Sequence, residues 1–546
     1  MQKANTEISR LLFVSNDTSE KAGGTAEGSP AFLKGGDMGK CNKVFIGLDN
    51  GGTTTKAAVF DMKGNELGVA SVSTDAICER PLYAEREMAD MWDANCKVIR
   101  EILEKTGTDP KDVACIAVCG HGKGLYLWGK DDKPVRNGIL SSDTRAYAIM
   151  QKWLEDGTEA AAGEMTIQHL MAFQPVVLLR WLKENEPENY ANIRWVFECK
   201  DYVRFRLTGK AMAERSDYSG ANLVNLYTQQ YDPKLLELFG IPEVWDALPP
   251  LCYASDLCGT ITAETARRTG LIEGTPVAGG AFDIDACALA TGVIDDRNVL
   301  MIAGTWSINE YVKDAPVTDG TALMNSLFCI PGTYLVEESS PTSAGNNEWF
   351  VRNLLPELSE KGHVYDEVNK WVEEIPPQEF VPLFLPFILA SNVHPNAKGS
   401  IIGITANHTR KHVARAIYEG IVFCHRWHFE RLLATRKDMP EKIRLAGGAT
   451  KSKVWVQMFA DVMQLPVETV MANETGALGC AIAGAVATGV YKDLPTAIAA
   501  MSPISPAVMP NPDLKEIYDK KYSLYTKAID CLDGFWSDMQ KVVEGK

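Results

Sequence analysis

Short apolar runs that end in glycine-rich turns are the main pattern in the first part of the chain. Residues 44–48 form one such run and predict a β-strand that leads into a turn at residues 49–52. Residues 55–60 predict a second strand, so the two runs and their turn indicate a hairpin and not a strand–loop–helix unit. Residues 113–118 are almost wholly apolar, which is typical of a buried strand, and they lead to a loop at residues 120–124.

The same strand-and-turn pattern returns in the second half of the chain. Residues 299–303 predict a buried strand before a Gly/Thr-rich turn, and residues 443–446 predict another before a glycine pair. Helical spacing or small-residue content predicts helices over residues 88–105, 410–435, 452–464 and 474–490. This weak repeat of architecture predicts two α/β halves, with a boundary near residue 294 and a cleft between them.

Composition and charge limit the kinds of molecule that the protein is expected to bind. The 546 residues include 55 basic and 71 acidic side chains, and the net charge of −16 argues against a nucleic acid or an anionic membrane. Thirteen cysteines are dispersed without a Cys-x-x-Cys pair, as expected of reduced thiols in a cytoplasmic protein. No apolar stretch reaches the roughly 18 residues of a membrane span. Residues 1–41 are polar and predict a disordered N-terminal extension, or sequence upstream of a start at Met38.

The first of three candidate phosphate-binding turns begins at Asp49. It continues through Gly51, Gly52, Thr53 and Thr54. Glycines leave backbone amides bare for an anion, threonine hydroxyls add donors, and a carboxylate can hold hydrated Mg²⁺. A plain hairpin turn uses the same small residues, so this turn alone does not decide between a phosphate site and a simple connection.

The other two turns follow predicted strands of the second half. Gly304 and Thr305 repeat the chemistry of the first turn, whereas Gly447, Gly448 and Ala449 would let a flat base lie against bare backbone. The alternative in each case is a strand connection, which also favours small residues. Three such turns in one chain indicate a nucleotide more strongly than any one of them. The Walker A pattern G-x-x-x-x-G-K-[ST] does not occur, so the sequence argues against a P-loop enzyme.

Asp283 is the candidate general base. It follows Ala281 and Phe282 after a pair of glycines, and burying a carboxylate beside apolar residues is costly unless it has a purpose. A hydroxyl substrate would supply that purpose, because Asp283 could accept its proton. The alternative is that Asp283 caps a helix over residues 286–290, a position that aspartate fills well.

His121 and Lys123 are candidate substrate-binding residues in the loop that follows the third predicted strand. They would hydrogen-bond to sugar hydroxyls. A lone histidine is more often a structural side chain, whereas packing explains a lysine between two glycines less easily. Asp143 and Arg145 are expected to pair as a surface salt bridge worth ~0–1 kcal/mol, and the sequence leaves open whether they contact a sugar.

In their order along the chain, these motifs resemble those of the FGGY carbohydrate kinases. The resemblance covers about residues 43–535 and rests on the segments 47–53, 120–124, 139–143, 200–202, 280–283, 304–305 and 447–449. Within that family, the sequence is most similar to bacterial L-xylulose (L-lyxose) kinases. The resemblance implies two actin-like α/β domains of the sugar kinase, Hsp70 and ribonuclease H-like type. They would span residues 42–294, for sugar and phosphate, and 295–546, for adenosine, and would close on ATP in an interdomain cleft.

The resemblance also implies a role for each motif. Asp49 and the turn at residues 51–54 would meet the phosphates and Mg²⁺, and Gly304 and Thr305 would hold the γ-phosphate side. Residues 447–449 would bind the adenosine. Asp283 would be the general base for direct in-line transfer, with His121 and Lys123 facing the sugar.

The residues at positions 122, 123 and 141 differ from those of many D-xylulose and glycerol kinases, so a different specificity is expected. L-xylulose is the first expectation for the substrate. D-xylulose, erythritol, glycerol or a keto acid are alternatives, and so is a nucleotide-gated module without kinase activity on the same fold. The expected partners are a small sugar and ATP, and a homodimer is left open.

Overall fold

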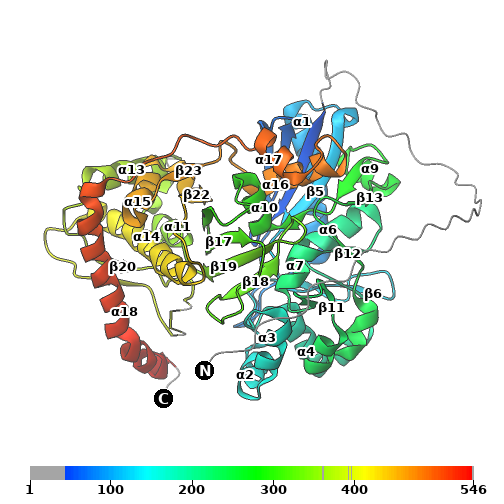
Figure 1. The fold of residues 1–546 in the computed structure, drawn as a ribbon, viewed down its shortest axis with the longest axis horizontal. Coiled ribbons are helices and arrows are strands. Elements are labelled where there is room, and N and C mark those ends of the chain that lie inside the picture. Colours follow the sequence, from blue (N-terminus) through cyan, green and yellow to red (C-terminus); the bar gives the residue numbers. More distant parts are fainter. Residues whose placement is uncertain (1–42, 360–361, 392, 395, 544–546) are drawn as a thin grey trace, which may run out of the picture. The chain divides into compact units, whose positions relative to one another are not determined.

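The computed structural model describes residues 43–359, 362–391, 393–394 and 396–543 (Figure 1). The expected disordered extension at residues 1–41 lies outside the described residues. The chain from residue 42 onward forms one compact unit that contains two large β-sheets. No helix of the described part of the chain is both long and apolar enough to cross a membrane.

The first sheet has seven strands and holds the first candidate turn. Its strands follow the order β13 (Leu257–Thr260), β14 (Pro276–Ala278), β5 (Val113–Gly120), β1 (Val44–Asn50), β2 (Thr54–Asp61) and β3 (Glu66–Ser73), and β15 (Ala281–Phe282) also pairs with β5. The second sheet has six strands in the order β18 (Met324–Leu327), β19 (Tyr334–Ser340), β17 (Ser307–Lys313), β16 (Asn298–Ala303), β22 (Lys442–Ala446) and β23 (Val467–Thr469).

The two sheets repeat one arrangement. In the first, β1 and β2 form an antiparallel hairpin, and β1 pairs in parallel with β5. In the second, β16 and β17 form an antiparallel hairpin, and β16 pairs in parallel with β22. The predicted hairpin and the predicted repeat of architecture are therefore confirmed. Because parallel strands end at the same edge of a sheet, each arrangement brings a hairpin turn beside the loop of a neighbouring strand.

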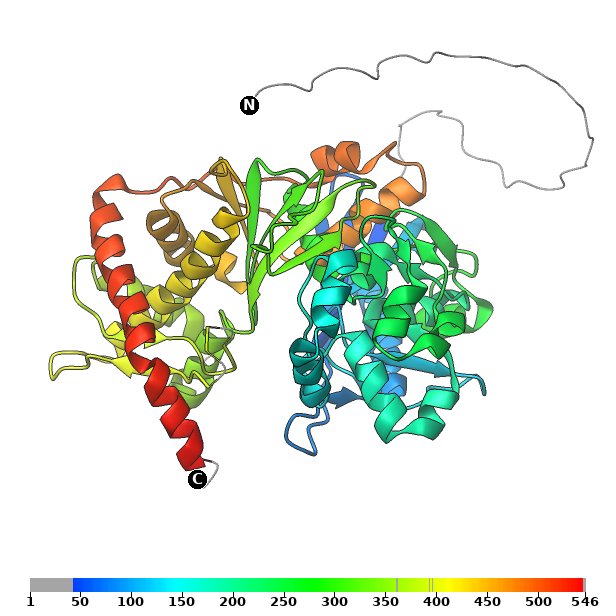
Figure 2. The ribbon, with the colours of Figure 1, turned by 60° about the horizontal axis from the view of Figure 1, so that its bottom comes forward.

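The long predicted helices are present and bury their apolar faces. Helix α1 (Met88–Thr106) packs on β2 and β3 with Trp92 and Ile99 buried, and it ends where Gly107 takes the left-handed φ of 64°. Helix α14 (Arg410–Ala434) covers β17 and β19 and packs against α15 (Lys453–Met463). Helix α18 (Lys515–Val543) contacts α14 and α15 (Figure 2).

Helix α16 (Thr475–Ala487) comes from the end of the chain but packs on β1 and β5 of the first sheet and against α10 (Asp283–Thr291) (Figure 1). Glycines make this packing close. A Cβ at Gly47 of β1 would lie 2.0 Å from the carbonyl oxygen of Ala477, and one at Gly479 would lie 2.0 Å from that of Ala286. The close packing expected of a helix rich in small residues is therefore confirmed, and it ties the end of the chain to the first sheet.

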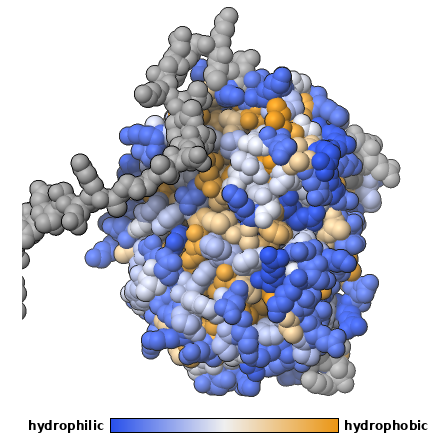
Figure 3. All heavy atoms as spheres, turned by 90° about the vertical axis from the view of Figure 1, so that its right-hand side faces the viewer, coloured by the Kyte–Doolittle hydropathy of each residue, from blue (hydrophilic) through white to orange (hydrophobic). Residues whose placement is uncertain are grey.

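The segment between β5 and β14 adds a further helical layer and its own core. Its helices include α2 (Tyr147–Glu155), α3 (Thr158–Thr166), α4 (Pro175–Asn185), α6 (Cys199–Thr208) and α7 (Arg215–Gly220). Figure 3 shows one face of the molecule, on which hydrophilic residues cover most of the surface and apolar ones lie in small areas between them. The described cysteines are all unpaired, and most are buried.

Candidate functional site

Asp49 lies at the end of β1, where it pairs with Lys56 of β2 and Cys119 of β5. The sequence placed Asp49 in the turn, but the ladder of hydrogen bonds extends the strand through Asn50. The turn itself is shorter and is closed by the Gly51 N–H, which donates to the Thr54 carbonyl at 3.0 Å. The Asp49 carboxylate therefore projects from a strand that is paired on both sides, and not from a loop.

Burial raises the pKa of Asp49 to about 6, with Lys56 lowering it and Glu474 raising it. Lys56 Nζ lies 2.8 Å from Glu474 Oε2, at the start of α16. A Cβ at Gly476 would lie 3.3 Å from Asp49 Oδ2, so the first turn of α16 directly faces this carboxylate. Neither Lys56 nor Glu474 stood out in the sequence, because the sheet pairing and α16 bring them together over a long separation.

The glycines of the first turn are not explained by the fold. A Cβ at Gly52 would meet nothing within 4 Å, and one at Gly51 would make only ordinary contact with the Thr54 carbonyl. Neither residue has a positive φ. A ligand that approaches the backbone is the remaining reason for small residues here. Buried Arg86 donates to the carbonyls of Gly51 and Gly52 and holds the turn. No local pattern around Arg86 indicates this contact, because it joins residues about 35 positions apart.

Asp283 is the first residue of α10 and directly follows β15. The cap position belongs to Phe282, and no side-chain capping hydrogen bond is made, so the helix-capping alternative does not account for this aspartate. Burial is the main cause that raises the pKa of Asp283 well above its usual value. The charges of Asp49 and Asp217 raise it further, and that of Lys123 lowers it.

Lys123 is 6% exposed and has an unusual backbone with φ of 61°. Its N–H donates to Glu198 Oε2 at 2.7 Å, and its Nζ lies 4.6 Å from the ring centroid of Phe282. Among the described residues, this ammonium has no carboxylate within ion-pair distance. A nearly buried ammonium without a partner, beside the ring that precedes Asp283, is suited to bind a polar ligand.

His121 lies in the same loop and is buried. Its Nε2 is 2.8 Å from the hydroxyl of Tyr126, and burial lowers the pKa of the imidazole to about 3, so the ring is neutral. Its Nδ1 is buried without a hydrogen-bond partner in the described part of the chain. The bond to Tyr126 supports a structural role, whereas the unpaired Nδ1 leaves one polar atom for a ligand.

The two turns of the second sheet lie side by side because β16 and β22 are neighbours. A Cβ at Gly447 would lie 3.1 Å from the Gly304 nitrogen and 2.6 Å from the Ala303 carbonyl, and Gly447 has a φ of 87°. The fold therefore requires a glycine at this position. Gly304 and Gly448 differ, since neither has a positive φ and a Cβ on either would meet no atom closer than 4.0 Å. Thr305 is exposed, whereas Ala449 is buried.

The predicted site residues therefore form two groups. Each group lies at the end of one sheet. The first holds Asp49, Gly51, Gly52, Thr53, Thr54, His121, Lys123 and Asp283 around β1, β5 and β15. The second holds Gly304, Thr305, Gly447, Gly448 and Ala449 around β16 and β22. Among the described residues, no hydrogen bond joins a member of one group to a member of the other.

Asp143 and Arg145 pair as expected, but not on the surface. Arg145 Nε lies 2.9 Å from Asp143 Oδ1, and Arg145 Nη2 lies 2.7 Å from Asp143 Oδ2, with both side chains fully buried. The pair also holds Tyr83, whose ring centroid lies 4.0 Å from the Arg145 guanidinium. The expected surface salt bridge is therefore wrong, because the chain folds over a pair that the local sequence leaves in solvent.

A nucleotide with Mg²⁺ fits these residues on two observations. The half-buried Asp49 carboxylate has a raised pKa, so a nearby divalent cation would stabilise its ionised form, and Mg²⁺ commonly uses one or two carboxylates together with substrate phosphates. The bare backbone at Gly52, Gly304 and Gly448 has room for a ligand and no packing reason to be glycine.

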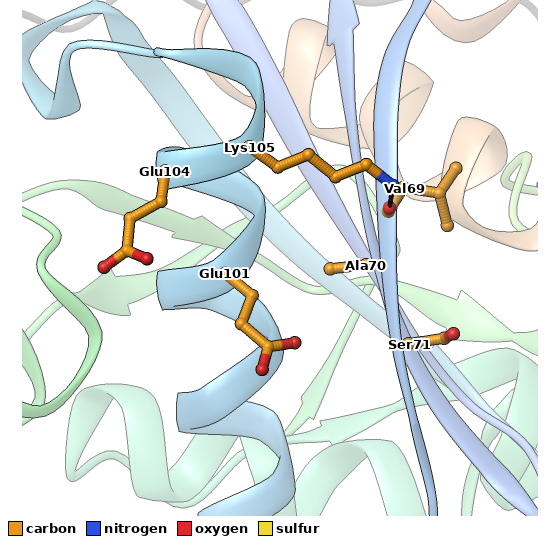
Figure 4. Close-up of a pocket in the computed structure, with 6 residues that line it drawn as sticks. All are labelled: Val69, Ala70, Ser71, Glu101, Glu104 and Lys105. Carbon is orange, nitrogen blue, oxygen red and sulfur yellow. Dashed lines mark hydrogen bonds between the residues drawn. The ribbon is translucent and has the colours of Figure 1, made fainter.

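A shallow surface pocket elsewhere has no part in this chemistry. It lies between α1 and β3 and is lined by Val69, Ala70, Ser71, Glu101, Glu104 and Lys105 (Figure 4). Lys105 crosses it and donates to the Val69 carbonyl at 2.7 Å. None of the predicted site residues lines this pocket, so we assign it no function.

Comparison with known proteins places both sheets in one family. Residues 44–290 match the N-terminal domain of the FGGY family of carbohydrate kinases, and residues 299–488 match its C-terminal domain. The chain is 39% identical to the L-xylulose/3-keto-L-gulonate kinase of Escherichia coli over 495 residues, covering 90% of this chain and 98% of that protein. It is 36% identical to a probable L-xylulose kinase of Pasteurella multocida, covering 89% of this chain and 99% of that protein.

Solved structures agree with the sequence comparison. The crystal structure of xylulose kinase from Rhodospirillum rubrum has a TM-score of 0.78 at 27% identity and covers 91% of this chain and 100% of its own. A Plasmodium falciparum glycerol kinase crystallised with ADP has a TM-score of 0.76 at 20% identity, covers 89% of this chain and 98% of its own, and shares the fold. The expected actin-like α/β fold is confirmed. The chain belongs to the FGGY family of carbohydrate kinases.

Proposed function

We propose that this carbohydrate kinase phosphorylates a small ketose, with L-xylulose as the first substrate, and that Asp283 is the general base. The observation that carries the proposal is the nearly buried Lys123 ammonium, which lies over the ring of Phe282 directly before Asp283 and lowers the pKa of that carboxyl. The names of the two relatives above support L-xylulose among the ketoses. Family membership argues against the alternative of a nucleotide-gated module without kinase activity.

The chemistry asks the protein mainly for positioning and for compensation of charge. Bound MgATP supplies the phosphoryl group and a cation near Asp49. Asp283 accepts the proton of the attacking sugar hydroxyl as the new oxygen–phosphorus bond forms and the bond to the ADP oxygen breaks. Lys123 lowers the pKa of Asp283, which favours the carboxylate form that a base requires, and it donates to a sugar oxygen.

The turns divide the nucleotide between them in this proposal. The backbone amide of Gly52 and the hydroxyls of Thr53 and Thr54 donate to phosphate oxygens, as do the backbone amide and the hydroxyl of Thr305. The N–H groups of Gly51 and Gly304 already bond to the carbonyls of Thr54 and Trp306, so these two glycines give the phosphates room and do not donate to them. Gly448 presents bare backbone to the adenosine. Residues 42–294 and 295–546 would act as two domains whose closure excludes water and limits wasteful hydrolysis.

A substrate panel tests the function. ADP release from ATP and Mg²⁺ is measured with L-xylulose, D-xylulose, erythritol, glycerol and 3-keto-L-gulonate, with a no-sugar control. We expect sugar-dependent release, with the highest kcat/KM for L-xylulose. A higher kcat/KM for another sugar would overturn the substrate, and release that no sugar stimulates would overturn the kinase reaction with these acceptors.

A further inference from the structure

A cluster of charged side chains is buried beneath the Lys123 loop, on α6, on α7 and at the residues that directly precede these two helices. We define the buried charge network as Glu198, Lys200, Asp201, Arg204, Glu214 and Asp217, each of which is at most 2% exposed. None of them lies among the site residues described above. Replacing such an ionic cluster with apolar residues often leaves the stability of a protein unchanged or raises it, so stability alone does not explain why these charges are buried.

Lys200 joins the members of this network. Its Nζ lies 2.7 Å from Asp201 Oδ2, 3.0 Å from Asp217 Oδ2 and 3.6 Å from Glu214 Oε2. Asp201 also receives a hydrogen bond from Arg204. Burial raises the pKa of both Glu198 and Glu214, and the network contains two cations, Lys200 and Arg204. A connected network of this kind holds a rigid geometry.

One end of the network holds the backbone of Lys123. Glu198 Oε2 accepts the Lys123 N–H at 2.7 Å, at the residue with the left-handed φ of 61°. Asp217 packs against the same loop, since a Cβ at Gly122 would lie 2.6 Å from its Oδ1. A lysine disfavours this backbone conformation, so the bond to Glu198 is what fixes the direction of its side chain.

The other end holds the backbone just before Asp283. The Phe282 N–H donates to Ser216 Oγ at 3.2 Å, and Ser216 Oγ donates to Glu214 Oε2 at 2.6 Å. Arg204 donates to the carbonyl of Gly279, four residues before Asp283. The same network therefore contacts the backbones that carry both the proposed base and the proposed sugar-binding ammonium.

We propose that the buried charge network sets the spacing between Asp283 and Lys123, with Glu198 and Ser216 as the positioning residues. The inference rests on the proposed roles of Asp283 and Lys123 in binding and deprotonating the sugar. Glu198 acts on the substrate through Lys123, and Ser216 acts on proton transfer through the Phe282 backbone. Neither residue needs to touch the sugar itself.

Variants at Glu198 test the first end. Glutamine can accept the Lys123 N–H and still present a polar group to Asp217, whereas leucine can do neither. Glu198→Leu is expected to raise KM for L-xylulose about tenfold or more, with little change in KM for ATP, because it removes a buried hydrogen bond. Glu198→Gln is expected to have a KM for L-xylulose much closer to that of the wild type. Equal changes in the two KM values, or no difference between the two variants, would overturn the assignment.

Ser216 and Ser219 form a matched pair for the second end. Both are fully buried on α7, but Ser219 Oγ accepts the N–H of Leu327 in β18 at 2.8 Å and donates to the Ser216 carbonyl at 2.8 Å. In the described part of the chain, no hydrogen bond joins the Ser219 hydroxyl to the backbone before Asp283, whereas the Ser216 hydroxyl makes one. Ser216→Ala is expected to lower kcat about tenfold or more, since small misplacements of reacting groups cost rate. Ser219→Ala is expected to lower the thermal midpoint to a similar extent and to keep kcat. Equal losses of kcat in the two variants would overturn the role of Ser216.

A double-mutant cycle separates this inference from the proposed function. If Glu198 acts through Lys123, Glu198→Leu has little further effect on sugar KM in a Lys123→Met background. Additive effects would overturn the network proposal and leave the role of Lys123 standing. If Lys123→Met alone leaves sugar KM unchanged, the proposed role of Lys123 fails first. Should Glu198→Leu not fold, the serine pair decides the inference.

Discussion

At the scale of single residues, the account depends on how burial and charge act on two carboxylates. Asp49 lies at the end of β1 and Asp283 follows β15, two strands that both pair with β5, and burial disfavours the charged form of each carboxylate. Lys123 and Lys56 respectively oppose that effect. A base must be ionised to accept a proton. Lys123 favours the ionised form of Asp283, and a bound cation would favour it further.

Lys123 is expected to act on the sugar. Lys123→Ala removes a charged hydrogen-bond donor, so KM for L-xylulose should rise about tenfold to a hundredfold while KM for ATP changes little. Steady-state kinetics with each substrate varied in turn measure both constants. Lys105→Ala is the control, because Lys105 bonds only to the Val69 carbonyl far from the site residues and should leave both constants unchanged. Equal effects of Lys123→Ala on sugar and ATP would show that Lys123 does not face the sugar.

Asp49 gives a pH dependence of stability with a definite sign. Its folded pKa, about 6, lies above the ordinary value of 3.8, so the stability it contributes is present below about pH 4 and is lost as the pH rises through 6. Without Mg²⁺ and nucleotide, Asp49→Asn should therefore have a higher thermal midpoint than the wild type at pH 8. The difference should shrink to roughly a third at pH 4.5, as thermal melts at both pH values can show. A difference of the same size at both would contradict the raised pKa.

At the scale of helices and strands, the sequence predicted those elements whose position depends on the local pattern of residues. The first hairpin, α1, α14 and α15 follow from short apolar runs, helical spacing and turn residues, and they are present within a residue or two of the expected bounds. The second strand of the other hairpin, β17, was not predicted. The end of β1 was wrong because the pairing of Asp49 with Lys56 and Cys119, and not the turn residues, decides where the strand stops.

Contacts across long separations were beyond the sequence. The local sequence of Asp143 and Arg145 shows two charged residues near each other and nothing of the chain that buries them. Glu198 and Ser216 meet the Lys123 and Phe282 backbones over separations of 75 and 66 residues. Such partners depend on how α6 and α7 pack beneath the loops, which no residue spacing reveals.

The glycine pair after β22 allows a test within one turn. Gly448→Ala adds a Cβ into open space, so we expect a raised KM for ATP and an almost unchanged thermal midpoint. Gly447→Ala adds a Cβ 2.6 Å from the Ala303 carbonyl at a positive φ and should lower the thermal midpoint markedly. Steady-state kinetics and melts of both variants provide the comparison. If Gly448→Ala leaves KM for ATP unchanged, this turn does not approach the nucleotide.

At the scale of the whole molecule, two sheets of the same arrangement carry complementary parts of the proposed site. The first sheet carries the carboxylates and the lysine, and the second carries two adjoining turns of bare backbone. Helix α16 packs the end of the chain on the first sheet, and its first turn faces the Asp49 carboxylate. A movement of either half that shifts α16 would therefore change the surroundings of that carboxylate. The net charge of −16 does not attract phosphates, so phosphate binding depends on local hydrogen-bond donors and a bound cation.

Closure of two domains predicts that sugar and nucleotide help each other to bind. A non-hydrolysable ATP analogue with Mg²⁺ should bind roughly five-fold or more tightly when L-xylulose is present, and the sugar should gain the same factor in the reverse titration. Isothermal titration calorimetry of both orders measures the coupling. Independent binding in either order would contradict closure on both ligands.

The central claim is that the Asp283 carboxylate takes the proton of the sugar hydroxyl, and the direct measurement is single-turnover phosphoryl transfer by Asp283→Asn. The asparagine keeps the shape of the side chain but cannot act as a base, so the rate of L-xylulose phosphorylation should fall by about 10²–10⁴ while Mg-nucleotide affinity stays near that of the wild type. A variant that keeps more than about a tenth of the wild-type rate would contradict the account.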